Sequence, residues 1–104
     1  LKTFWNQTLM PSAGHVRHLY FSEGAGFRNL SKTDPSLEVL SWYEDGVPGA
    51  VRFTYGAGRV LLIGAHPEAV KEWWGPDESR SEPLMDPDGL DHFLIRDFLF
   101  WLTS

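Results

Sequence analysis

The chain has 104 residues, with nine Lys and Arg against fourteen Asp and Glu, which gives a formal net charge of −5. Apolar residues make up 42% and aromatic residues 14%, a composition that is typical of one folded domain and excludes a disordered or fibrous chain. The absence of cysteine excludes disulfides, thiolate metal sites and a cysteine nucleophile within this sequence. The acidic balance also argues against a nucleic-acid partner.

The first half of the chain predicts short strands separated by turns. The segments of β character are His15–Phe21, Leu37–Tyr43, Ala50–Tyr55 and Arg59–Ile63. Turn residues at 44–46 and 56–58 join the last three segments, so we expect an antiparallel meander. The run 60–63 is apolar throughout, which predicts a strand covered on both faces in the interior of a sheet.

Two helices are expected in the second half, on either side of a loop. The first covers Pro67–Trp74, because proline is favoured at a first helical position. The loop Gly75–Gly89 holds five acidic residues and three prolines. The terminal helix starts near Asp88, which can cap free N–H groups, with Asp91 in its first turn. Its apolar surface is too broad for one neighbour to cover; the main stripe is Leu90, Leu94, Phe98, Trp101 and Leu102.

No apolar run reaches the roughly 18 residues of a membrane-spanning helix, and no signal-peptide pattern follows Leu1. We therefore expect a cytoplasmic protein without a membrane partner, or one whose leader has been removed. His15 and His18 point to opposite faces of a strand and lack further ligands, so we expect no metal. The segment Gly24–Gly26 lacks the rest of a nucleotide-binding fingerprint, so we also expect no cofactor.

The residues that carry chemistry are His66 and Glu68, which directly follow the apolar strand. A histidine at a strand end can act as a general base, and a carboxylate on its second nitrogen would fix the tautomer. The other interpretation is structural, with a satisfied histidine at a strand end and a carboxylate that favours the start of a helix. The spacing alone leaves both interpretations open.

Several segments together resemble class I glutamine amidotransferase-like domains, whose Cys-His-Glu triad ends in a His-Pro-Glu such as 66–68. The match begins at Tyr55–Arg59 and is closer to the domain at the N-terminus of some biotin-protein ligases. That branch continues with a Trp-rich helix and an Asp-His near the start of a terminal helix, similar to Glu72–Trp74 and Gly89–His92. The segment Leu19–Phe27 resembles its strand and glycine-bearing turn, so the likeness covers the chain from about residue 15 onward.

The resemblance implies a flavodoxin-like three-layer α/β domain, of which residues 1–104 are the C-terminal half. It implies that His66 is the base and Glu68 its orienting group, and that the chain is inactive alone because the cysteine is missing. The partner would be the missing N-terminal half or another protein chain, and a half-sheet also suits self-association. A small amide-type substrate would contact backbone N–H groups at Gly24 and Gly26.

The alternative is a non-catalytic relative that uses the pocket for a small ligand or for docking a partner. Trp73 and Trp74 can stack on a ring of such a ligand, although aromatic residues on a short helix more often pack against a sheet. The substrate, the acyl acceptor and any connection with biotin stay open at this point.

Overall fold

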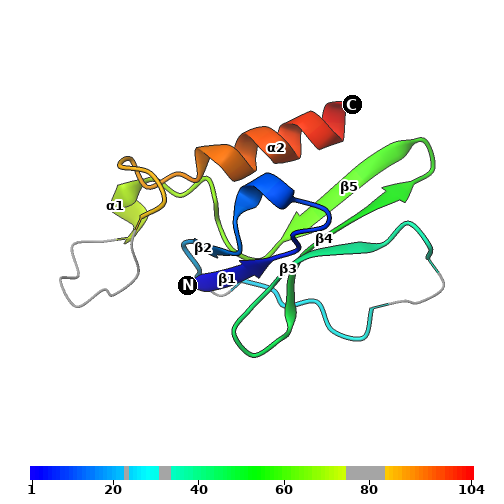
Figure 1. The fold of residues 1–104 in the computed structure, drawn as a ribbon, viewed down its shortest axis with the longest axis horizontal. Helices are drawn as coiled ribbons and strands as arrows, with labels where there is room; N and C mark the ends of the chain where they lie inside the picture. Colours follow the sequence, from blue (N-terminus) through cyan, green and yellow to red (C-terminus); the bar gives the residue numbers. More distant parts are fainter. Residues whose placement is uncertain (23, 31–33, 75–83) are drawn as a thin grey trace.

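The computed structural model describes residues 1–22, 24–30, 34–74 and 84–104. One five-stranded sheet has the order β2-β1-β3-β4-β5, and all neighbouring strands are antiparallel. Helix α2 and the short 3₁₀ turn η1 lie on the same side of this sheet (Figure 1). The elements are β1 (Lys2–Trp5), η1 (Pro11–Ala13), β2 (Val16–His18), β3 (Glu38–Trp42), β4 (Pro48–Tyr55), β5 (Gly58–Ile63), α1 (Lys71–Trp74) and α2 (His92–Thr103). The mixed α/β class is therefore confirmed.

The predicted meander is present as β3, β4 and β5. Tyr55 pairs with Gly58, so residues 56 and 57 form a two-residue turn, and Gly56 has a φ of +59° there. Glycine adopts this left-handed conformation without the steric cost that a side chain would add. Turn chemistry and alternating apolar residues thus place the hairpin where the sequence predicts it.

The position predicted for β5 is wrong. Among the described residues this strand pairs with β4 alone, so it lies at the edge of the sheet and not in its interior. Leu61 and Ile63 pack against the core, whereas Leu62 on the opposite face is 42% exposed. An apolar run therefore belongs here to a strand with one covered face and an open side.

Strand β1 has no counterpart among the predicted elements, although it is an inner strand of the sheet, between β2 and β3. Trp5 is buried, and its indole N–H donates to Thr3 Oγ1 at 2.8 Å. Its ring lies 6.0 Å from that of Phe98, which joins the sheet to α2. The central cluster comprises Trp5, Met10, Ala13, Leu19, Leu40, Ala50, Ala65, Leu94 and Phe98.

Helix α2 begins three residues later than predicted, because Asp91 and not Asp88 is its N-cap. Asp91 Oδ1 accepts the backbone N–H of Leu94 at 3.2 Å. The same carboxylate, only 1% exposed, also accepts two hydrogen bonds from Arg17, at 2.6 and 2.7 Å. Asp88 instead caps the turn before the helix through the N–H of Leu90. A long-range ion pair therefore selects which aspartate starts the helix.

Helix α1 is shorter than the predicted Pro67–Trp74 and starts at Lys71. The Pro67 carbonyl accepts the N–H of Asp91 at 2.7 Å, so it bonds to the start of α2 and not to a following helical turn. The Lys71 N–H donates to the carbonyl of Asp88, also at 2.7 Å. Of the predicted loop, residues 75–83 lie outside the described residues, and residues 84–89 form bends and a turn.

Candidate functional site

The backbone of His66 is held in place by a contact with a distant segment. His66 lies three residues after the end of β5, and its N–H donates to the Tyr20 carbonyl at 2.7 Å. The two residues form an isolated antiparallel bridge. This bridge fixes the backbone of the histidine shortly after the end of β5.

The side chains of His66 and Glu68 are in direct contact. Nδ1 of the imidazole lies 2.7 Å from Glu68 Oε1, and Pro67 between the two residues is buried. The histidine side chain is 36% exposed. Within the described ranges no other hydrogen bond reaches this ring, so Nε2 has no protein partner there. The contact assigns the proton to Nδ1, because a carboxylate accepts, and leaves the Nε2 lone pair free to take a proton.

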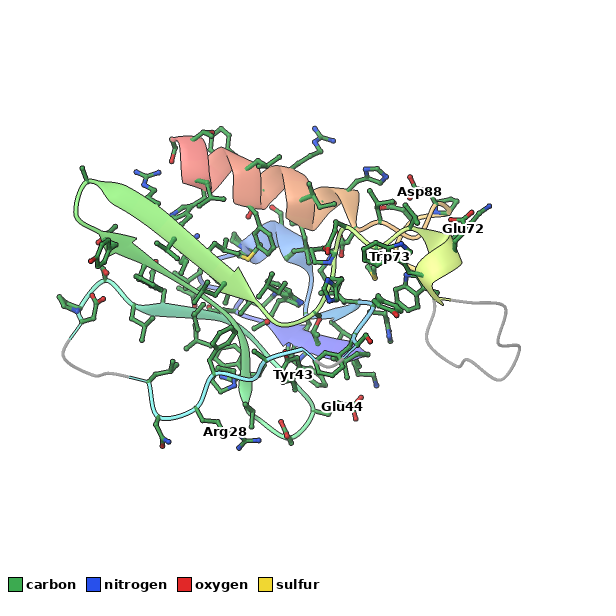
Figure 2. The ribbon with its side chains drawn as sticks, turned by 180° about the vertical axis from the view of Figure 1, so that it is seen from behind. Arg28, Tyr43, Glu44, Glu72, Trp73 and Asp88 are labelled. Carbon is green, nitrogen blue, oxygen red and sulfur yellow. The ribbon has the colours of Figure 1, made fainter. Side chains whose placement is uncertain are left out.

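Aromatic side chains form a wall beside the imidazole. The Tyr20 ring centroid is 5.9 Å from that of His66, and the Trp73 centroid is 6.1 Å from it. Tyr20 and Trp73 are also in edge contact with each other, at 6.0 Å. Trp73 is half-exposed near the end of the molecule that carries α1 (Figure 2). Trp73 was a sequence candidate, whereas Tyr20 was missed because only the long-range bridge brings it here.

Two glycines allow the chain to fold tightly beneath this site. A Cβ on Gly64 would lie 2.0 Å from the Ala25 carbonyl oxygen, and one on Gly24 would lie 1.9 Å from the Gly64 oxygen. The Tyr43 hydroxyl donates to the same Ala25 oxygen at 2.5 Å, and burial raises the pKa of that tyrosine. Close backbone packing is therefore a structural reason for glycine at both positions.

The predicted substrate contacts are placed differently by the fold. Gly24 packs against the turn that leads to His66, whereas the nearest atom to a Cβ on Gly26 would be Val47 Cγ1, at 2.9 Å. The structure thus brings Gly24 close to the candidate site and sets Gly26 against the turn that joins β3 and β4. A role of their N–H groups in substrate binding stays a prediction.

A second histidine–carboxylate pair lies at the start of α2. His92 Nε2 is 2.8 Å from Asp88 Oδ2, and this hydrogen bond raises the pKa of His92 and lowers that of Asp88. His92 also lines an open surface cavity of about 460 Å³, together with Arg17, Asp86, Phe93, Arg96, Asp97 and Phe100. No hydrogen bond or ring contact among the described residues joins this pair to His66.

The remaining histidines do not form a metal site in the part of the chain that the structure describes, where no three His, Asp, Glu or Cys side chains gather. His15 packs edge-on against Phe4, with ring centroids 5.7 Å apart. His18 is partly buried, and desolvation is the main reason that its pKa is lowered. In the same described ranges, no helix has the length and apolar character needed to cross a bilayer.

Comparisons of this chain with protein-family models, with curated proteins and with solved structures found no match. A proposed function therefore follows from the geometry around His66 alone.

Proposed function

We propose that this chain supplies the general base and its orienting carboxylate to an acyl-transfer site of the class I glutamine amidotransferase type. His66 is the base and Glu68 orients it, and the nucleophilic cysteine belongs to another polypeptide segment. The observation that carries the proposal is the 2.7 Å contact between His66 Nδ1 and Glu68 shortly after the end of a strand, with Nε2 bonded by none of the described residues. In this proposal residues 1–104 are the C-terminal half of a flavodoxin-like three-layer domain.

The chemistry follows from the free nitrogen. His66 Nε2 takes the proton of the cysteine thiol, and the thiolate attacks the carboxamide carbon to form a tetrahedral intermediate. Backbone N–H groups of the other segment stabilise the oxyanion. The imidazolium then returns the proton to the leaving nitrogen, which departs as ammonia, and a thioester is left. A water molecule that gives its proton to Nε2 cleaves the thioester, and the product is a carboxylic acid.

Glu68 contributes through the imidazole and not through the substrate. Its carboxylate accepts the Nδ1 proton, which keeps Nε2 unprotonated in the neutral ring and favours the imidazolium when it forms. The backbone bridge from Tyr20 to His66 holds the ring in one place. Glu68 is thus a positioning residue, and its loss is expected to lower the rate less than loss of His66.

The test measures glutamine hydrolysis by a preparation in which this chain is joined to, or complexed with, its cysteine-bearing segment. We expect His66→Ala to lower kcat by about 10²- to 10⁴-fold, the usual contribution of a general base. Glu68→Gln should lower kcat less and shift the imidazole ¹⁵N signals of His66, which report the tautomer. Glu72→Gln on α1 is the matched control, since Glu72 is exposed and makes no contact with His66 in the described structure. An unchanged rate in His66→Ala would refute the catalytic role.

The aromatic wall supports a second candidate, a site that binds a small ligand without catalysis. Tyr20 and Trp73, which contact each other, offer ring surfaces beside an accessible imidazole. If the joined preparation bound glutamine with no hydrolysis, and Trp73→Ala abolished the binding, this second function would replace the first.

A further inference from the structure

The outer edge of β5 carries backbone groups without partners. Gly64 N–H donates to the Gly49 carbonyl of the neighbouring strand at 3.0 Å. This hydrogen bond shows that the backbone groups of Gly64 point toward β4. In an antiparallel pair, residues whose backbone groups point toward the partner strand alternate with residues whose groups point away from it. Arg59, Leu61 and Ile63 therefore direct their N–H and C=O groups away from β4, and no described segment bonds to them. The N–H and C=O groups of these three alternate residues are available to form hydrogen bonds with another extended strand.

An apolar surface continues from this edge onto α2, which lies beside β5 (Figure 1). Phe93 packs under the Arg17 guanidinium, 5.1 Å from it, so that side of the helix faces β2 at the far end of the sheet. Leu99 and Leu102 lie on the opposite side of the helix, toward β5, because successive residues are rotated by 100°. Leu99 is 57% exposed. Leu62 borders the same edge on the opposite face of the sheet. We call Leu62, Leu99, Leu102 and the outer backbone of β5 the edge surface.

Charge is almost absent from the edge surface in a chain whose net charge is −5. Arg59 is the only charged residue of β5, and its guanidinium is held by the Trp101 carbonyl at 2.6 Å and lies over the Trp101 ring. Exposed edge strands are usually protected by charged side chains, prolines or bulges. The run 60–63 contains none of these, and its pairing with β4 is regular. The edge surface is therefore suited to an apolar strand that brings no charge of its own.

We propose that the edge surface binds the same surface of a second copy of this chain, with the two β5 strands antiparallel. Leu61 lies opposite Leu61 of the copy, and Arg59 lies opposite Ile63, so all outward-directed backbone groups are paired. A two-fold axis perpendicular to the sheet relates the two copies, so both α2 helices lie on the same face of the joined sheet. Their Leu99 and Leu102 side chains meet there. The two Arg59 side chains are four residues apart along the joined strands, so like charges do not face each other.

A second copy matches this surface better than an arbitrary strand, because the edge surface is complementary to itself under that rotation. The apolar side of each helix meets an identical apolar side, and Leu62 lies directly opposite Val60 of the copy. The acidic remainder of the chain stays outside the contact. Because each copy contributes one strand edge and a few apolar side chains, we expect a weak dimer with a micromolar dissociation constant.

Sedimentation equilibrium of the whole chain between about 1 and 500 μM tests the proposal, with that range centred on the expected affinity. We expect the mass to rise from monomer to dimer and then to stay constant. Leu62→Lys and Leu99→Lys should each raise the dissociation constant about tenfold or more. Phe100→Lys is the matched control, because Phe100 is 75% exposed but lies on the side of α2 that faces away from β5. In the dimer, the amides of Leu61 and Ile63 should exchange with deuterium more slowly as the concentration rises.

A monomer throughout this range would overturn the proposal, as would a dimer that the two lysine variants leave intact. Growth beyond the dimer would also overturn it, since a two-fold contact closes after two copies. Circular dichroism of each variant separates a lost interface from a lost fold. The proposal does not rest on the proposed function: failure of glutamine hydrolysis leaves it unchanged, and a monomeric chain leaves the role of His66 unchanged.

Discussion

The buried carboxylate of Asp91 should contribute more to stability than any other ion-paired group of the described structure. Asp91→Ala removes two hydrogen bonds from Arg17, at 2.6 and 2.7 Å, and the cap on the Leu94 N–H. Breaking a buried pair costs about 3–5 kcal/mol, because the partner charge is left uncompensated, and loss of a cap costs about 1 kcal/mol. The terms overlap, so we expect about 4 kcal/mol. That is a large part of the roughly 5–15 kcal/mol available to a domain.

Urea denaturation followed by tryptophan fluorescence measures this change, with two comparison variants. Asp91→Asn keeps a side-chain oxygen that can accept from Leu94 and Arg17 but loses the charge, so its difference from Asp91→Ala measures what the uncharged oxygen contributes. Glu38→Ala breaks a pair with Arg52 at 2.9 Å, but the Glu38 side chain is 39% exposed, so we expect at most about 1 kcal/mol. If Asp91→Ala destabilised the protein no more than Glu38→Ala, the reasoning from burial would be refuted.

Three further outcomes follow from the packing and the charges. Gly64→Ala should lower the free energy of unfolding in urea by about 1–3 kcal/mol, because its Cβ would overlap the Ala25 carbonyl oxygen and the Tyr43 hydroxyl. Gly58→Ala is the control and should cost less than half as much, because the nearest atom to its Cβ is 3.5 Å away. Leu94→Ala should cost about 2–5 kcal/mol, since this side chain is fully buried, and a cost under 1 kcal/mol would contradict its place in the core. The hydrogen bond to Asp88 raises the pKa of His92 above 6.5, and the same bond lowers that of Asp88 below 3.8. The His92 contribution is complete below pH 6.5 and is lost as pH rises through the raised pKa, while the Asp88 contribution is complete above pH 3.8 and is lost in acid. His92→Gln should therefore lower Tm most between pH 3.8 and 6.5, and an equal effect at pH 9 would contradict the pairing.

The sequence predicts those parts of the fold that depend on neighbouring residues. Alternation in 50–55 and the glycines at 56–58 predict the β4–β5 hairpin, and the two-residue spacing anticipates the contact between His66 and Glu68. The sequence places Asp91 in the first turn of the terminal helix, whereas it is the N-cap, held there by Arg17, which is 74 residues away in sequence. Local patterns contain no information about that distance.

The same limit explains the other differences. An apolar run predicts burial, but it does not say whether a further strand lies beside it, so β5 was expected in the interior. Tyr20 reaches the candidate site only through a bridge to His66, and β1 joins β2 to β3 through pairings that no local signal marks. Long-range pairing thus decides the surroundings of the site, whereas short-range spacing decides its central pair.

If both proposals hold, the open side of β5 makes completion of the His66 site and self-association mutually exclusive. One edge can pair with one strand at a time, and β5 ends only three residues before His66. In the proposed dimer that edge is occupied, so a cysteine-bearing strand that approaches His66 along β5 must first displace the copy. The amount of this chain relative to its complement would then set how much of it is active, without any change at His66 itself.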